Sequence, residues 1–388
     1  MQKQSAAKAE SAVAGLSGRL ESIDLLRGLA MVLMALDHTR GFFSEYGFNP
    51  RDVTEPALFL TRWITHFCAP TFILLTGLSA WLYGRGKSTS EVSWFLFTRG
   101  LWLILLEFTL IQFGWSFDPG LPASLGGGII WVIGACMVLM AGLVYLPLAA
   151  LAVFALALIA GHNLFDGVRA EDLGAMTPLW HILHQPGRIA LGGGFSAYVL
   201  YPIVPWIGVM AAGYVLGPIM QRPAEGRQRV LFGLGAAITI GFVLLRATNL
   251  YGDPAPWTVQ ETPLATVLSF INCQKYPPSL LFLMMTLGPA LMLLAAFEHV
   301  RGPIAEWLRT FGRVPFFFYV THIYLIHALA VVTAFVLTGA LVLSRPEIGF
   351  GLPGVYVTWI VVLVLLYPLC RWFMDLREGR SGWWWRYL

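Results

Sequence analysis

The segment from Ser22 to Phe43, SIDLLRGLAMVLMALDHTRGFF, places ionisable side chains in an otherwise apolar run of membrane-spanning length. These side chains are Asp24, Arg27, Asp37, His38 and Arg40. Each Asp or Arg near the centre of a spanning helix costs about 2.5–3.5 kcal/mol on the insertion scale. Such side chains must therefore face protein or water, and they mark a functional site.

Three of these side chains share one helix face. At about 100° per residue, Arg27 and His38 fall within about 20° of each other, and Asp24 falls about 40° from His38. A rise of about 1.5 Å per residue separates Arg27 from His38 by about 16 Å. We interpret the stripe as an anion site at one end and a site of proton chemistry at the other. The alternative is that Asp24 and Arg27 form a structural ion pair.

Asp37 points about 100° away from His38, so we expect the partner of His38 to come from another helix. Glu107 in LWLILLEFTLIQFGW, His66 in THFCAPTF and His322 in FFFYVTHIYLIHALA are the candidates. His327 is five residues beyond His322, about 140° around a helix, so at most one of the two faces the same chamber. The alternative is that His327 is a buried core residue whose hydrogen bonds are made within the protein.

The elements that position these residues follow from composition. The 388-residue chain is 57% hydrophobic and 12% charged, against about 25% charged in an average soluble domain. Apolar runs recur from end to end, which predicts an all-α, polytopic membrane protein with one transmembrane domain. The formal charge of +4 is spread over loops, so no nucleic-acid partner is expected.

We predict about ten transmembrane helices, with both termini cytoplasmic. The spans are expected near 24–43, 57–82, 93–115, 127–145, 147–162, 196–219, 229–247, 279–298, 312–337 and 354–375. In this arrangement 14 Lys and Arg residues fall in inside segments and 5 in outside segments, as the positive-inside rule requires. The predicted regions are a polar tail (1–18), the transmembrane domain (19–376) and a cytoplasmic tail (377–388).

Two predicted outside loops exceed the usual connection length. One covers 163–195, and its WHILHQP motif holds His181 and His184 without a further ligand nearby, so no metal site is expected. The other covers 249–279, with Trp257, Lys275 and a short apolar run at 264–271 that fits an interfacial or re-entrant helix.

The segment RLESIDLLRGLAMVLMALDH resembles the first-span signature of membrane acyltransferases. Together with HFCAPTFILLTGLSAWL, NLYGDPAPW, KYPPSLLFLMMTLGPAL and FGRVPFFFYVTHIYLIHAL, it resembles the bacterial relatives of heparan-alpha-glucosaminide N-acetyltransferase over roughly residues 19–375. The resemblance implies an acetyl-CoA or other acyl-CoA donor on the cytoplasmic side. It also implies an acceptor on the far side, typically a sugar amine or hydroxyl.

The resemblance to heparan-alpha-glucosaminide N-acetyltransferase implies a catalytic histidine in the loop after the first span. That loop, SEYGFNPRDVTEP, contains no histidine here. His38 instead matches the first-span histidine of the related acyltransferase type 3 family, and this resemblance assigns it the catalytic role. A neutral imidazole acts as a general base on the acceptor or is itself acylated. Arg27, Arg99 and Arg313 are expected to bind the phosphates of CoA. The expected substrate-facing or supporting residues are Asp24, Asp37, Arg40, His66, Glu107, Trp257, Lys275 and His322.

The competing interpretation is a transporter or channel in which the polar stripe lines a permeation route. The asymmetry of the stripe, basic at one end with a histidine at the other, together with the family resemblance, favours an acyltransferase. The expected location is the bacterial inner membrane, and the expected partners are the lipid bilayer, acyl-CoA and a carbohydrate-type acceptor. A homodimer is left open.

Overall fold

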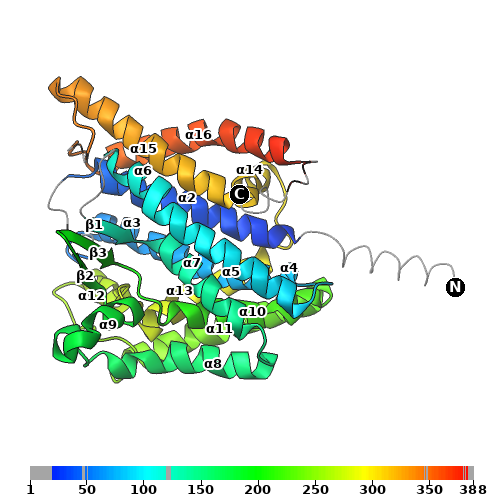
Figure 1. The fold of residues 1–388 in the computed structure, drawn as a ribbon. Coiled ribbons are helices and arrows are strands. Elements are labelled where there is room, and N and C mark those ends of the chain that lie inside the picture. Colours follow the sequence, from blue (N-terminus) through cyan, green and yellow to red (C-terminus); the bar gives the residue numbers. More distant parts are fainter. Residues whose placement is uncertain are drawn as a thin grey trace.

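The computed structural model describes residues 20–45, 49, 51–118, 124–344, 346, 348–378, 380 and 382, and most of these are helical. The predicted N-terminal tail, 1–18, lies outside the described residues, and so does most of the predicted C-terminal tail. The helices follow the apolar runs of the sequence, and the longer ones form a bundle with roughly aligned axes (Figure 1).

The first half of the bundle contains α2 (Glu21–Phe43), α3 (Pro56–Ile64), α4 (Cys68–Tyr83), α5 (Thr89–Leu106), the π-helical turn η2 (Glu107–Ile111), α6 (Gln112–Ser116), α7 (Ile129–Leu143) and α8 (Leu148–Gly161). The second half contains α9 (Thr177–Leu183), α10 (Trp206–Val215), α11 (Ala224–Thr248), α12 (Pro263–Ile271), α13 (Leu280–Ala296), α14 (Pro303–Arg313), α15 (Pro315–Thr338) and α16 (Leu352–Arg377). The turn at 144–147 between α7 and α8 confirms the division predicted there. The short helix α12 likewise confirms the apolar run at 264–271 as a helix.

Six helical segments among the described residues are long and apolar enough to cross a membrane. They are Pro56–Tyr83, Thr89–Ser116, Leu148–Phe165, Ala224–Thr248, Pro315–Thr338 and Leu352–Arg377. Shorter apolar helices cover Ile129–Leu143, Trp206–Gln221 and Leu280–Ala296. The chain is therefore a multi-pass membrane protein by helix length and composition, while ten crossings and cytoplasmic termini stay predictions.

Segments predicted on the cytoplasmic side lie together at one end of the bundle (Figure 1). Glu21 at the start of α2 forms an ion pair with Arg309 of α14 at 2.8 Å. Arg227 of α11 pairs with Glu298 after α13. The opposite end carries α9, α12 and a small sheet. The cytoplasmic location of the first of these ends stays a prediction.

The sheet consists of β1 (Ser124–Gly127), β2 (Gly187–Gly192) and β3 (Phe195–Val199) in the order β1-β3-β2. The central strand β3 pairs in parallel with β1 and antiparallel with β2. This sheet is not predicted from the sequence, because its strands are short and rich in glycine and lie in segments assigned to loops or to a span. The sheet brings 124–127 and 195–199 to the same end as the Phe43 end of α2.

Two predicted spans have different boundaries in the structure. The span at 196–219 was wrong in its first part, where β3 precedes a proline-containing segment and α10 begins only at Trp206. Pro202 and Pro205 lack the N–H that a continuous helix requires. The span at 312–337 is divided between α14 and α15, because Val314 is non-helical and Pro315 starts the second helix.

Close contact between α2 and α14 depends on two glycines. A Cβ on Gly28 would lie 1.9 Å from the carbonyl oxygen of Leu308, and a Cβ on Gly312 would lie 1.8 Å from that of Asp24. Any side chain at either position would force the helices apart. This contact holds Arg27, the neighbour of Gly28, against the start of α15.

Candidate active site

Two cavities lie along α2. The arginine cavity, about 370 Å³, contains four arginines from four helices: Arg27, Arg99, Arg313 and Arg377. The histidine cavity, about 710 Å³, contains His38 and lies toward the sheet end of the bundle. Ile129 and Tyr319 line both cavities. The polar stripe predicted on α2 therefore connects two adjoining spaces.

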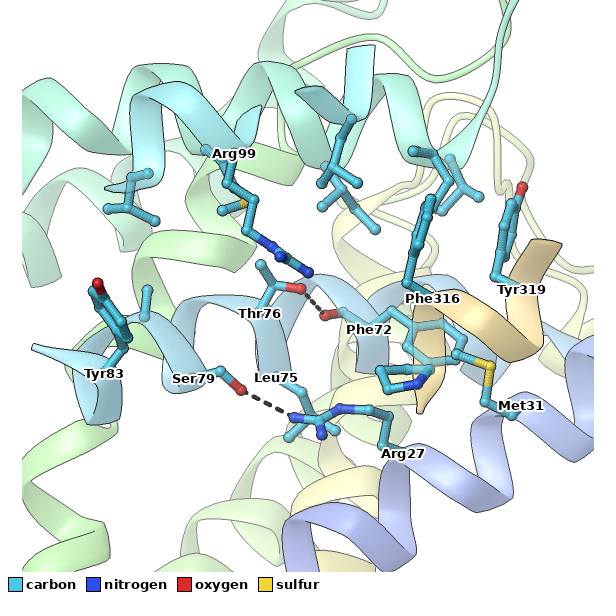
Figure 2. Close-up of a pocket in the computed structure, with 18 of the residues that line it drawn as sticks. Arg27, Met31, Phe72, Leu75, Thr76, Ser79, Tyr83, Arg99, Phe316 and Tyr319 are labelled. Atoms are coloured by element: carbon cyan, nitrogen blue, oxygen red, sulfur yellow. Dashed lines mark hydrogen bonds between the residues drawn. The ribbon is translucent and has the colours of Figure 1, made fainter. Parts of the chain in front are cut away.

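The arginine cavity has a cationic part and an apolar part. Arg27 of α2 and Arg99 of α5 reach into it from two sides (Figure 2). Arg377 donates to the carbonyl oxygen of Arg313 at 3.4 Å, which places the end of α16 beside the end of α14. The apolar lining includes Met31, Met34, Phe72, Leu103, Ile133 and Phe316. This cavity suits an elongated ligand with an anionic end and a less polar arm.

Arg27 is held by protein contacts from three directions. It forms an ion pair with buried Asp24 at 3.2 Å, donates to the carbonyl oxygen of Gly312 at 3.1 Å and donates to the Ser79 hydroxyl at 3.0 Å. Asp24 also lies 3.9 Å from Arg313. The ion pair named as the alternative interpretation is present, and Arg27 lines the cavity as well. Asp24 therefore orients two of the cavity's cations.

His38 has a buried histidine as its partner. Nδ1 of His38 lies 2.7 Å from Nε2 of His322, and Nδ1 of His322 lies 2.9 Å from the carbonyl oxygen of Phe318. A carbonyl oxygen only accepts, so Nδ1 of His322 carries the proton. In the neutral pair, Nε2 of His322 then accepts from Nδ1–H of His38. Nε2 of His38 keeps its lone pair, which is the state required of a general base.

The expected partner from another helix is thus His322, and His327 faces elsewhere. Nδ1 of His327 lies 2.8 Å from the carbonyl oxygen of Gly114, and its Nε2 lies 2.7 Å from that of Leu343. His327 therefore ties α15 to the end of α6 and to the segment after α15. In the described structure His327 is therefore a buried, hydrogen-bonded core residue.

Asp37 and its arginine partners form a charged group in the wall of the histidine cavity. Its carboxylate accepts from Arg62 at 2.5 and 2.6 Å and pairs with Arg40 at 3.1 Å. All three side chains line the cavity. Because the carboxylate is shared by two guanidinium groups, the cost of an acid in an apolar helix is offset. Within the described residues Asp37 forms no hydrogen bond with His38, in agreement with its angular position.

Glu107 caps a helix and does not bond His38. Its two carboxylate oxygens accept from the backbone N–H groups of Gly128 at 3.2 Å and Trp131 at 3.1 Å, at the start of α7. These are N–H groups that the helix itself leaves without partners, and the helix dipole favours a negative charge there. Glu107 opens the π-helical turn η2 and also lines the histidine cavity.

Tyrosines from the sheet end complete the histidine cavity. Tyr198 of β3, Tyr201 and Tyr276 line it, and the hydroxyls of Tyr201 and Tyr276 are 3.3 Å apart. Burial raises the pKa of Tyr276, but the positive charges of Lys275 and Arg62 outweigh this, and the pKa lies below its usual value. The tyrosines give the cavity both hydroxyl groups and flat apolar surfaces.

Five predicted site residues do not line either cavity. Two of them, Asp24 and His322, contact the cavity-lining side chains of Arg27 and His38. Lys275 is buried with its ammonium 5.3 Å from the Tyr276 ring centre, so it lies behind the cavity wall. His66 packs its ring 5.3 Å from that of Phe282. Trp257 donates to the carbonyl oxygen of Arg246 at 3.0 Å, within the folded 249–279 segment. The structure brings neither His66 nor Trp257 to the cavities, because both are used in packing.

Several residues of the site were missed from the sequence, including Arg62 and the cavity tyrosines. Arg377 was assigned to a tail, although it belongs to the last turn of α16. Trp115 packs edge-on against His38 with ring centres 4.9 Å apart, and Tyr319 lies 6.4 Å from His38 in the same manner. The position of Tyr319 three residues before His322 was the available signal, because residues at that spacing share a helix face.

His181 and His184 both bond backbone carbonyl oxygens. Nδ1 of His181 bonds the carbonyl oxygen of Gln185 at 2.9 Å, and Nε2 of His184 bonds that of His162 at 3.0 Å. Within the described residues, no group of three or more His, Cys, Asp or Glu side chains is arranged to hold a metal ion.

Comparison with known proteins identifies the family. Residues 19–245, more than half of the chain, match the family described as heparan-alpha-glucosaminide N-acetyltransferase, catalytic. The matched region contains α2, whose residues line both cavities. Helices α15 and α16 lie beyond the matched region. No curated protein matches the chain significantly.

Proposed function

The chain belongs to the heparan-alpha-glucosaminide N-acetyltransferase catalytic family, and from this membership we propose that it transfers an acyl group from acyl-CoA to a carbohydrate-type acceptor, with His38 as the catalytic base. The family is one of membrane acetyltransferases, so acetyl-CoA is the expected donor. The protein is proposed to act in a bacterial inner membrane.

The observation that carries the proposal is the pair of adjoining cavities on α2. Four arginines in one cavity match the phosphates of CoA, because guanidinium groups bind phosphate through paired hydrogen bonds. The apolar lining from Met31 to Phe316 suits the pantetheine arm that extends from those phosphates. The arm would deliver the thioester toward the boundary with the histidine cavity.

The histidine cavity is proposed to hold the acceptor. Its tyrosine rings and hydroxyls suit a sugar, whose C–H faces pack on aromatic rings while its polar groups form hydrogen bonds. The cavity lies at the sheet end of the bundle, which the Lys and Arg distribution predicts to be extracytoplasmic. Donor and acceptor would thus approach from opposite sides of the membrane.

In the transfer step, Nε2 of His38 accepts the proton of the acceptor's hydroxyl or amine. The acceptor atom forms a bond to the thioester carbonyl carbon, and the carbon–sulfur bond breaks as the intermediate collapses. The proton held by His38 passes to the departing CoA sulfur, so the products are the acylated acceptor and CoA thiol. If the acyl group passes through His38, the same lone pair is the nucleophile.

The test measures release of CoA thiol by the purified protein from acetyl-CoA, with and without amino sugars and other sugars. The His38→Ala variant should remain folded and lose turnover by about 10²–10⁴-fold, the usual contribution of a general base. His299→Ala is the matched control, because His299 is exposed in the connection between α13 and α14. A folded His38→Ala variant with wild-type turnover would refute the role of His38.

A further inference from the structure

Tyr319 occupies the boundary between the two cavities. Of the two described residues that line both, Ile129 has an apolar side chain, and Tyr319 alone brings a polar group to the boundary. Its side chain is 5% exposed. Figure 2 shows Tyr319 at one end of the arginine cavity, with Tyr83 at the other. A thioester carried along this cavity must come to Tyr319 to reach the acceptor.

Tyr319 and Trp115 both pack against His38. Trp115 lies edge-on to the His38 ring at 4.9 Å between ring centres, and both Trp115 and Tyr319 line the histidine cavity. The Tyr319 hydroxyl carries one proton that it can donate in a hydrogen bond. The three side chains form one compact group at the cavity boundary.

His38 and Tyr319 are fixed relative to each other by α15. Tyr319 and His322 are three residues apart on this helix, so they share a face, and His322 holds the His38 ring. The ring centres of His38 and Tyr319 are 6.4 Å apart. A carbonyl group at the boundary would thus have a base on one side, for the attacking acceptor, and a hydroxyl donor nearby.

We propose that Tyr319 is a second catalytic residue that donates its hydroxyl proton in a hydrogen bond to the thioester carbonyl oxygen, an inference that rests on the proposed function. As the acceptor bonds to the carbonyl carbon, the carbonyl π electrons move onto this oxygen, which becomes an oxyanion. The Tyr319 hydroxyl stabilises that charge without transferring its proton. When the carbon–sulfur bond breaks, the carbonyl is restored and the hydrogen bond weakens.

This role predicts a specific division of kinetic effects. The hydrogen bond is stronger to the oxyanion than to the substrate carbonyl, so its loss lowers kcat with little change in the KM for acyl-CoA. Removing one donor of this kind typically lowers kcat by about 10²–10³-fold. If Tyr319 had a steric role only, kcat would depend on the presence of its ring and would not change on loss of the hydroxyl.

The experiment compares Tyr319→Phe, Tyr319→Ala and Tyr324→Phe by steady-state CoA release in detergent. Tyr324 is the matched control, because it is on the same helix, donates to the carbonyl oxygen of Leu110 at 2.7 Å and lines neither cavity. Its variant should stay within about twofold of wild type, as expected for positions outside the site. Tyr319→Phe should lose kcat by about 10²–10³-fold at an unchanged KM.

Wild-type turnover in Tyr319→Phe would overturn the role of Tyr319 while leaving the proposed function intact, and a defect confined to Tyr319→Ala would assign Tyr319 a steric role only. An increase in KM with unchanged kcat would also contradict the inference. Absence of transfer in the wild-type protein, with every acceptor tried, would instead count against the proposed function itself. Melting temperatures of all variants show whether each remains folded.

Discussion

At the scale of single residues, the site depends on how two histidines share their protons. His322 uses Nδ1 to donate to its own helix backbone and so presents Nε2 to His38. This arrangement performs the task that a carboxylate performs in a Ser-His-Asp triad, which is to fix the tautomer and ring orientation of the base. A neutral acceptor suffices here, and it avoids a buried charge beside the catalytic imidazole.

The role of His322 as a positioning residue is testable. His322→Ala should lower kcat by about 10²–10⁴-fold, because His38 loses the acceptor that keeps its Nε2 unprotonated. The KM for acyl-CoA should not change, since His322 does not line the arginine cavity. His322→Gln retains an acceptor oxygen and should recover part of the loss. Equal kcat in the wild-type and alanine variants would contradict the role.

The sequence predicted part of this residue-scale arrangement. Helical periodicity placed Arg27 and His38 on one face and limited the choice between His322 and His327, because both arguments depend only on local geometry. It could not identify which helix supplied the partner of His38, since that depends on how α2 and α15 pack. The sequence also could not show that Trp257 and His66 pack away from the two cavities, because their contacts depend on tertiary packing.

At the scale of elements, Glu107 connects α5 and its π-helical extension η2 to the start of α7. The carboxylate accepts hydrogen bonds at the start of α7. This helix begins inside the bundle, next to the Gly126–Gly128 segment of the cavity wall. The sequence singled out Glu107 as an intramembrane acid but not as a cap. The cap involves backbone N–H groups, which carry no signature in the side-chain pattern.

Loss of this cap should reduce stability more than catalysis. Glu107→Ala leaves the Trp131 N–H without its carboxylate acceptor, at a cost of about 1–3 kcal/mol, and thermal unfolding in detergent should show a lower melting temperature. Glu107→Gln keeps one acceptor oxygen and should be intermediate. An unchanged melting temperature together with lost turnover in both variants would show that Glu107 belongs to the chemistry rather than to the cap.

At the scale of the whole molecule, composition and the Lys and Arg distribution predicted a multi-pass helical bundle, and six membrane-length helices are present among the described residues. The small sheet and the late start of α10 at Trp206 were not predictable from apolar runs. Short glycine-rich strands become ordered only by pairing with each other across 124–199. The proposed two-sided reaction rests on the position of the arginine cavity toward one end of α2 and of His38 toward the other.

The most direct measurement of this two-sided reaction uses sealed, right-side-out proteoliposomes or membrane vesicles with labelled acetyl-CoA either trapped inside or added outside. A membrane-impermeant amino sugar is supplied outside, and its acetylation is followed in the wild-type protein and in His38→Ala. We predict acetylation only when acetyl-CoA is inside, and none with His38→Ala. Equal acetylation from external acetyl-CoA in sealed vesicles, or transfer that persists in a folded His38→Ala variant, would contradict the account.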